Sequence, residues 1–262
     1  MSYPQRIICI TEEGVEWLYK LGQEDKIVGV SAYVERPTQA KKDKKVVSSF
    51  VKANLKSIRK LKPDLILGYS DIQKDIARDL IGEGFNVWIS NHRSLEDVLN
   101  YLLALGSLVG ERDKSLEIIS EYRKKMDSFK EKTKELIQRP KIYIEEWDEP
   151  MISGIQYFSE LIDVCGGENI FKDRERGFLA KDRFVDSKEV IERDPDAIFA
   201  CWCGKKVDMK SFSKRAGWEK IKAVKNNLIF DLDPAIFLQP GPALFEEGLD
   251  RAYEYLNKNI SK

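Results

Sequence analysis

The alternation of apolar runs with amphipathic stretches predicts an α/β protein. Short apolar runs such as "RIICI" and "DLILG" suit buried strands, and stretches of helical periodicity follow them. Regular alternation of strands and helices implies parallel sheets with right-handed crossovers. We therefore expect parallel strands covered by helices.

Two parts of the chain repeat one plan. Asn54–Leu67 ("NLKSIRKLKPDLIL") and Asp186–Phe199 ("DSKEVIERDPDAIF") both indicate a short helix, a Pro-Asp pair and an apolar strand. Proline ends the helix because the residue before it disfavours the α region. The strand and helix upstream, "RIICI" with "GVEWLYKLG", also match "KIYIEEW" with "YFSELIDVCGG". Each half therefore predicts one small α/β lobe.

A stretch without glycine or proline, residues 111–139, separates the halves, and its apolar residues recur at helical spacing. We expect an N-terminal lobe over 1–110, a connecting long helix over 111–139 and a C-terminal lobe over 140–262. This is an architecture of two Rossmann-like lobes with parallel sheets joined by one helical spine. Ligands gather at the carboxyl ends of parallel strands, so a cleft between the lobes is the expected binding site.

Composition narrows the function. The 44 basic and 44 acidic residues balance, so no net charge attracts nucleic acid or an anionic membrane. No apolar run approaches the roughly 20 residues of a membrane helix, so no membrane insertion is expected. The N-terminus lacks the apolar core of a signal peptide, which predicts a cytoplasmic protein as encoded. A periplasmic or extracellular location is the alternative if a leader was removed. Many Lys, Glu and Ile residues with a single His are typical of a thermophile.

Catalytic motifs are scarce. The single histidine, His92, lies in no nucleophile–base motif, and no phosphate-binding glycine loop occurs. His92 is a weak candidate for a metal ligand, and Cys201 and Cys203 would point the same way on a strand. A cytoplasmic metallochaperone or metal-dependent enzyme using these three residues is therefore one alternative. The main interpretation is a binding protein without chemistry.

The stretch "IYIEEWDEPMISG" ends an apolar run in four carboxylates around Trp147. A metal cage, an acid–base pair and a solvated rim are the alternatives. Glu145 and Glu146 are adjacent, so on a strand they point to opposite faces, and Pro150 is expected to end the strand soon afterwards. We interpret the stretch as a recognition edge, where Trp147 packs against ligand while the acids are solvated or accept amide hydrogens. Such acids favour a neutral or cationic ligand.

Several pieces together resemble a known family: "GVSAYVERPTQA", "NLKSIRKLKPDLIL", "PMISG", "DVCGGENIF", "RDPDAIF" and "PGP". They resemble the substrate-binding proteins of ABC importers for vitamin B12, haem and iron–siderophores, and most of all the cobalamin-binding members. The resemblance implies the two-lobed class III periplasmic-binding-protein-like fold with a helical backbone. It also implies a bound corrinoid, cobalamin or cobinamide, or a related metal chelate as ligand, with no required cofactor.

The resemblance assigns ligand contacts to both lobes. The positions it implies are Thr11, Glu12, Gly14, Tyr33, Phe50, Tyr69, Trp147, Trp202, Asp233, Phe237, Pro240 and Gly241. Aromatic side chains suit this role because a flat macrocycle needs wide apolar walls with a few polar groups at its edge.

Two features depart from the family pattern. Importer members carry a glutamate at the tip of each lobe for docking to the permease, and those positions here are Lys56 and Lys188. Ala243 stands where the cobalamin-binding pattern has an arginine. An ABC permease is therefore a candidate partner whose docking charges would have to be reversed. The chain is expected to hold a corrinoid-like ligand in the cytoplasm, with the substrate-binding component of an importer as the alternative.

Overall fold

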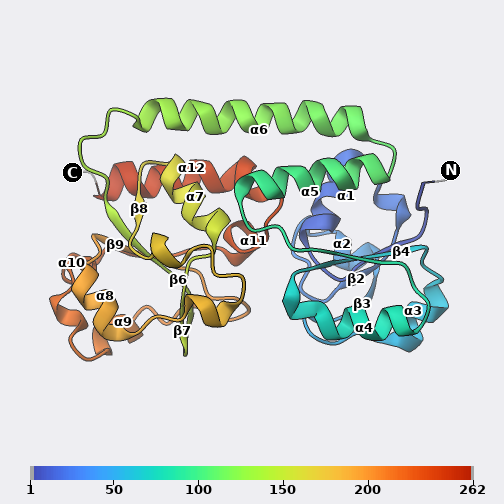
Figure 1. The fold of residues 1–262 in the computed structure, drawn as a ribbon, viewed down its shortest axis with the longest axis horizontal. Helices are drawn as coiled ribbons and strands as arrows, with labels where there is room; N and C mark the ends of the chain where they lie inside the picture. Colours follow the sequence, from blue (N-terminus) through green and yellow to red (C-terminus); the bar gives the residue numbers. More distant parts are fainter. Residues whose placement is uncertain (1–2, 261–262) are drawn as a thin grey trace. The chain divides into compact units, whose positions relative to one another are not determined.

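The computed structural model describes the backbone of residues 3–260 and the side chains of residues 3–257. Its contacts divide the chain into two compact units (Figure 1). Unit 1 contains the residues up to His92 together with Glu96–Glu121, and unit 2 contains Arg93–Leu95 and the residues from Tyr122 onward. Each unit has its own five-stranded sheet.

The sheet of unit 1 is wholly parallel, as the apolar runs predict, with strand order β3-β2-β1-β4-β5. Its strands are β1 (Ile7–Cys9), β2 (Ile27–Ser31), β3 (Lys45–Ser48), β4 (Leu65–Tyr69) and β5 (Val87–Ser90). Helices cover both faces, with α1 and α5 on one and α3 and α4 on the other (Figure 1). The bounds are α1 (Glu13–Leu21), α2 (Ala40–Asp43), α3 (Leu55–Leu61), α4 (Lys74–Gly82) and α5 (Leu95–Leu108).

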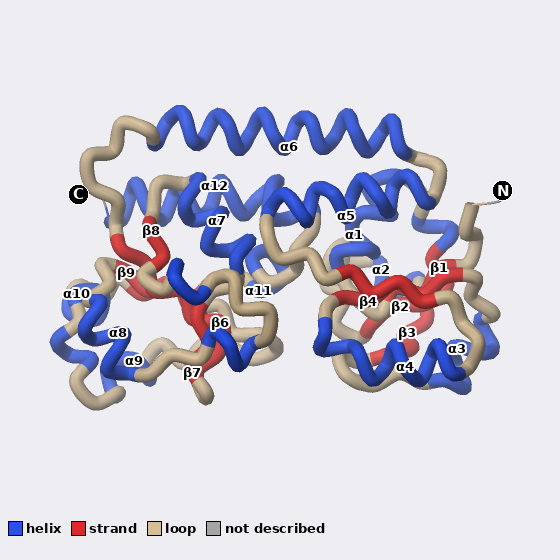
Figure 2. The backbone as a smooth tube through the Cα atoms, viewed as in Figure 1, coloured by secondary structure: helices blue, strands red, loops and turns tan. Residues whose placement is uncertain are grey.

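The sheet of unit 2 departs from the prediction because it is mixed. Its strands are β6 (Lys141–Asp148), β7 (Met151–Ser153), β8 (Glu168–Asn169), β9 (Ala197–Ala200) and β10 (Ile229–Asp231). Parallel pairs join β6 to β8 and β9, and β9 to β10, whereas β7 runs antiparallel to β6. The chain turns back at Glu149–Pro150 (Figure 2). Strand β6 ends at Asp148, two residues before Pro150, as expected, but the chain then turns back into β7, which was not predicted.

Helices also cover unit 2. They are α7 (Gln156–Val164), α8 (Ser187–Arg193), α9 (Ser211–Lys214), α10 (Lys222–Lys225), α11 (Pro234–Phe237) and α12 (Leu249–Glu254). Helix α12 follows one π-helical turn, Leu244–Gly248, and continues into another, Tyr255–Ile260. Helices α7 and α12 lie on one side of the sheet, and α8, α9 and α10 lie on the other (Figure 1).

The repeated helix–Pro-Asp–strand plan is present in both units. Asn54 and Asp186 cap α3 and α8 by accepting hydrogen bonds from backbone N–H groups of the first turn. Both helices end in a left-handed residue, with φ of 47° at Lys62 and 43° at Asp194. The aspartate after each proline then accepts hydrogen bonds from backbone N–H groups at the start of the unit's first strand. The repeated helix–Pro-Asp–strand sequence therefore encodes the same anchor for the first strand of each unit.

Helix α6 (Arg112–Thr133) confirms the predicted long helix but ends six residues before Arg139. Its N-terminal part packs in unit 1, where Gly106 of α5 permits a close approach because a Cβ there would lie 1.8 Å from Ser115 Oγ. Its C-terminal part packs in unit 2, where Tyr122 stacks on Phe245 at 5.0 Å between ring centroids. Among the described residues, no helix is long and apolar enough to cross a membrane.

Candidate functional site

Three predicted aromatic contacts lie where strands of unit 1 end. Tyr33 follows β2, Phe50 follows β3, and Tyr69 is the last residue of β4. Tyr33 and Phe50 pack edge to face with ring centroids 6.3 Å apart. Tyr33 is 49% exposed and Phe50 is half-buried, so both rings offer apolar surface to solvent. Tyr69 is half-buried, and its hydroxyl donates a hydrogen bond to the carbonyl oxygen of His92 at 3.2 Å, which fixes the orientation of the ring.

His92 is packed inside unit 1. Its ring stacks on Tyr101 at 4.5 Å and lies 4.7 Å from the Tyr69 ring. Its Nδ1 is 2.8 Å from Ser90 Oγ, and the residue is buried. Within the part of the chain that the structure describes, no three His, Cys, Asp or Glu side chains gather in a metal-binding group. The geometry therefore gives His92 a packing role beside Tyr69.

Glu12 and Glu13, at the start of α1, are buried, and no basic side chain among the described residues forms an ion pair with either of them. Burial raises the pKa of Glu12 to about 7, against a hydrogen bond from Ser31. Burial likewise raises the pKa of Glu13 to about 8, against a hydrogen bond that Thr11 Oγ donates. Among the described atoms, one carboxyl oxygen of each has no hydrogen-bond partner. Both carboxyls are therefore easily protonated near neutral pH.

Two further predicted contacts near β1 are also buried. Thr11 is 3% exposed, and its hydroxyl is engaged by Glu13. A Cβ at Gly14 would lie 3.0 Å from the Tyr101 hydroxyl, so glycine here serves the packing of α1 against α5. Glu12 is buried as well, with 6% of its surface exposed.

Three of the four carboxylates around Trp147 are bound by basic side chains, whereas the fourth, Glu149, is exposed. Glu145 is fully buried, and Arg215 binds it through two contacts of 2.5 and 2.9 Å. The Trp202 indole N–H also donates to Glu145, at 3.0 Å. Removing either partner of this bidentate ion pair would destabilise the fold, because the other charge would then be buried without compensation.

The next two acids are paired as well. Glu146 accepts from Arg183 at 2.8 Å and from the Ile155 backbone N–H at 2.6 Å. Asp148 accepts from Lys205 at 2.5 Å. The interpretation of these acids as solvated or free to receive ligand amides is therefore wrong. Their basic partners lie 37 to 70 residues further along the chain, where local sequence gave no indication of them.

Trp147 is half-buried, and its indole N–H donates to the Glu149 carbonyl at 2.9 Å. Lys205 Nζ lies 4.2 Å from its ring centroid. Trp147 pairs across the hairpin with Ile152, which in turn pairs with Phe184. Residues directly opposite on neighbouring strands have adjacent side chains, so these three form an apolar row that ends at Phe184, 42% exposed. Sequence reasoning missed Ile152 and Phe184.

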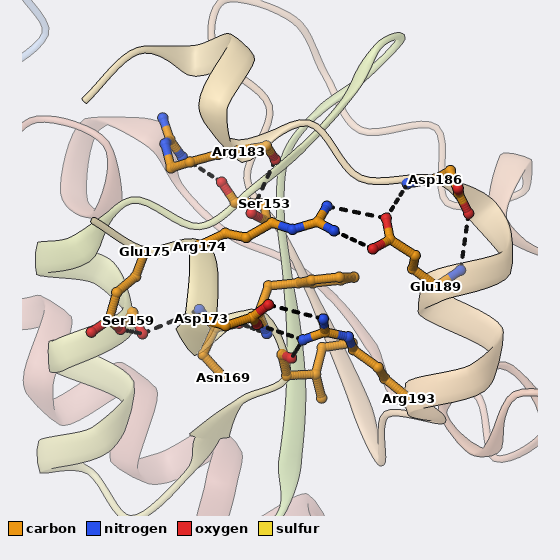
Figure 3. Close-up of polar contacts among 12 residues, drawn as sticks. Ser153, Ser159, Asn169, Asp173, Arg174, Glu175, Arg183, Asp186, Glu189 and Arg193 are labelled. Atoms are coloured by element: carbon orange, nitrogen blue, oxygen red, sulfur yellow. Dashed lines mark hydrogen bonds and ion pairs between the residues drawn. The ribbon is translucent and has the colours of Figure 1, made fainter. Parts of the chain in front are cut away.

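The segment before Phe184 is fixed by polar contacts (Figure 3). Arg183 donates to the Ser153 carbonyl, and Ser153 Oγ donates back to the Arg183 carbonyl at 3.1 Å. Nearby, Arg174 binds Glu189 of α8 and also donates to the Phe184 carbonyl at 2.7 Å. Phe184 is therefore held exposed by a rigid support.

The remaining predicted contacts of unit 2 are mostly in the core. Trp202 is 2% exposed and packs near Phe212, and Phe237 is fully buried and stacks on Phe158 at 5.2 Å. Pro240 and Gly241 are buried as well. Asp233 is exposed, and its carboxylate caps α11 by accepting from the Ala235 backbone N–H. We leave Trp202 and Phe237 out of the ligand surface, because indole and phenyl groups buried this deeply have no free face.

The remaining residues singled out in the sequence are Cys201 and Cys203 and the two lysines at the predicted docking positions, Lys56 and Lys188. Burial raises the pKa of the Cys201 thiol well above its ordinary value, whereas Cys203 is exposed. Lys56 and Lys188 are exposed and equivalent, because each is the second helical residue after its cap, in α3 and α8 respectively. The repeat therefore puts one exposed cation at the same position of each unit.

Comparison with known proteins identifies a family that has this fold. The family model described as "Periplasmic binding protein" matches residues 7–236. The chain belongs to the periplasmic binding protein family. This family membership and its relatives confirm the resemblance to substrate-binding proteins of the vitamin B12, haem and iron–siderophore class.

Similar curated proteins include importer components. The chain is 27% identical over 252 residues to YvrC of Bacillus subtilis, an uncharacterized ABC transporter substrate-binding lipoprotein, covering 93% of this chain and 77% of that protein. It is 28% identical over 246 residues to a vitamin B12-binding protein of Vibrio vulnificus, covering 91% and 85% respectively.

Solved structures of this family share the fold. The periplasmic vitamin B12-binding protein BtuF of Vibrio cholerae superposes with a TM-score of 0.77 at 23% identity, covering 99% of this chain and 98% of that one. IsdE of Staphylococcus aureus, solved with haem, gives 0.82 at 20% identity, covering 98% and 100%. At such identities the similarity establishes the two-lobed architecture alone.

Proposed function

We propose that this periplasmic binding protein is the substrate-binding component of an ABC importer and that it carries a corrinoid or a related flat metal chelate. The observation that carries the proposal is the solvent-facing aromatic pair Tyr33 and Phe50, which like Tyr69 lies where the parallel strands of unit 1 end. Aromatic rings on short, fixed segments bind flat ligands with little loss of rotamer freedom.

Unit 2 also has an apolar surface that we propose as a ligand contact. The row from Trp147 through Ile152 to Phe184 is apolar, and ion pairs and hydrogen bonds support it from both sides. Glu145, Glu146 and Asp148 are each bound by a basic side chain, so within the described part of the chain the exposed Glu149 is the acid of this stretch that a ligand would meet without an ion pair. Apolar contact with Trp147 and Phe184 is therefore the proposed contribution of this unit.

The relatives favour an importer over a cytoplasmic carrier. One curated relative is named as a substrate-binding lipoprotein and others as vitamin B12-binding proteins, which supports a protein that works outside the cytoplasm. Lys56 and Lys188 then require acidic partners on the permease, because a like charge at a desolvated contact would repel. The metal-enzyme alternative gains no support, since the His92 Nδ1 faces Ser90 and the Cys201 thiol is buried.

Calorimetric titration with cyanocobalamin, cobinamide and haemin tests the ligand. We expect saturable micromolar or tighter binding of at least one of the two corrinoids. Phe50→Ala and Trp147→Ala should each weaken it by more than about 1 kcal/mol, because stacking area is lost. Ile81→Ala, at an exposed apolar position of α4, is the matched control and should leave affinity unchanged.

The outcomes separate the parts of the proposal. Binding of haemin alone would keep the aromatic surface and replace the ligand. Failure of all three ligands would overturn the proposed ligand class. Binding that neither Phe50→Ala nor Trp147→Ala weakens would overturn the proposed site.

A further inference from the structure

A buried amide lies beneath the aromatic ligand surface of unit 1. Gln73 is 1% exposed, although glutamine is a residue type that is mostly exposed in folded proteins. It is the last residue of a short 3-10 turn, Asp71–Gln73, between β4 and α4. A glutamine buried this completely must find hydrogen-bond partners for both ends of its amide.

All three hydrogen bonds of the Gln73 side chain go to backbone atoms. Its Nε2 donates to the Ile10 carbonyl at 2.8 Å and to the Phe50 carbonyl at 3.2 Å. Its Oε1 accepts from the Tyr69 backbone N–H at 2.9 Å. One side chain therefore joins the segments that follow β1 and β3 to the end of β4.

The local sequence is built to admit this amide. A Cβ at Gly68 would lie 2.6 Å from Ile89 Cδ1 and 2.7 Å from Gln73 Oε1, so a larger residue there would displace one or both of these side chains. Ser70 adopts a positive φ of 60°, and its carbonyl accepts from the Gln73 backbone N–H at 3.2 Å, closing the turn. The stretch "GYSDIQ" thus encodes both the turn and the space for the side chain.

We propose that Gln73 is a positioning residue for ligand binding, which holds Phe50, Tyr69 and the segment beginning at Thr11 in one arrangement before the ligand arrives. The inference rests on the proposed function, because Phe50 and Tyr69 are its proposed ligand contacts. Without the amide, the three segments lose their shared anchor, and ordering them on binding costs affinity.

The test compares Gln73→Met with Leu80→Ala in calorimetric titrations with cobinamide. Methionine matches the length of glutamine but makes none of the three hydrogen bonds. Leu80→Ala removes a fully buried side chain from the core of unit 1, so it lowers stability without touching the amide. We expect Gln73→Met to raise the cobinamide Kd about tenfold and Leu80→Ala to leave it within about twofold.

A double-mutant cycle identifies the route of the effect. In a chain that already carries Phe50→Ala and Tyr69→Ala, adding Gln73→Met should change the Kd by less than about threefold, because the positioned rings are gone. A full tenfold effect in that background would overturn the positioning role. So would an unchanged Kd in Gln73→Met when Phe50→Ala weakens binding, and that result would leave the proposed function intact.

Hydrogen exchange supplies a readout that needs no ligand. The Tyr69 amide should exchange faster in Gln73→Met than in Leu80→Ala when the two variants are compared at equal global stability. Equal exchange rates of the Tyr69 amide in the two variants would refute the proposal that Gln73 anchors the end of β4. If the wild type binds no cobinamide while the Tyr69 amide is released in Gln73→Met, the proposed ligand fails and the anchor stands.

Discussion

Glu13 offers a sharp prediction, because a fully buried carboxyl without a counter-charge should make stability depend on pH. Four groups surround it: Thr11 donates a hydrogen bond, while Glu12, Cys9 and Tyr101 add no positive charge. Replacing the carboxyl with an amide in Glu13→Gln keeps the shape and an oxygen that can accept from Thr11. The variant therefore removes the titration and little else.

The magnitude follows from the pKa. Burial raises the pKa of Glu13 from 4.5 to about 8, so the folded state keeps a proton that the unfolded state releases as pH rises above 4.5. Stability contributed by the protonated form is therefore lost progressively between pH 4.5 and about 8. At 1.36 kcal/mol per pKa unit, the loss reaches about 5 kcal/mol at most. Glu13→Gln should consequently match the wild type near pH 4.5 and exceed it by several kcal/mol at pH 9.

Urea denaturation followed by far-UV circular dichroism at pH 4.5, 6, 7.5 and 9 measures this difference. Glu117→Gln, at an exposed position of α6, is the matched control and should show no pH-dependent gain. A stability difference between Glu13→Gln and wild type that is constant from pH 4.5 to 9 would refute the reasoning. It would mean that the folded chain accommodates the ionised carboxylate without cost.

Three further substitutions test the scaffold. Arg215→Met should destabilise unit 2 by about 3–5 kcal/mol in urea denaturation, because Glu145 loses its buried partner. The control Arg78→Met, which removes two exposed ion pairs, should cost less than about 1 kcal/mol. Asp64→Ala and Asp196→Ala should each cost about 1–2 kcal/mol and speed hydrogen exchange at the start of the anchored strand in their own unit. Loss of protection in both units from a single substitution would contradict independent anchors.

The fold was largely predictable because its determinants are local in sequence. The Pro-Asp repeat, the apolar runs and the uninterrupted amphipathic stretch carry their own geometry, and they located β1, β4, β6, β9 and α6, whereas the short strands β2, β3 and β8 were not predicted. The hairpin of β6 and β7 was missed because "DEPM" looks like the end of a strand. The turn at Glu149–Pro150 instead returns the chain beside β6, and only the pairing of Trp147 with Ile152 reveals it.

The site was less predictable because its chemistry is nonlocal. Tyr33, Phe50 and Tyr69 were identified through a resemblance, and the structure places them where strands of unit 1 end. The acids around Trp147 were misread because Arg215, Arg183 and Lys205 are distant in sequence. Trp202 and Phe237 are buried in the core of unit 2, which the sequence did not indicate, since an aromatic residue beside a strand end can face the core or the solvent.

The two units share their supports at one edge of the sheet and differ at the other. At the amino ends of the strands, Asp64 and Asp196 each accept a hydrogen bond from a backbone N–H where the first strand of their unit begins, and Asp64 accepts a second one from Gln5. Where the strands end, unit 1 is joined by the neutral amide of Gln73, whereas unit 2 is joined by charged pairs such as Glu145 with Arg215. The shared anchor belongs to the repeated helix–Pro-Asp–strand plan, whereas the unlike edges give each unit a different surface.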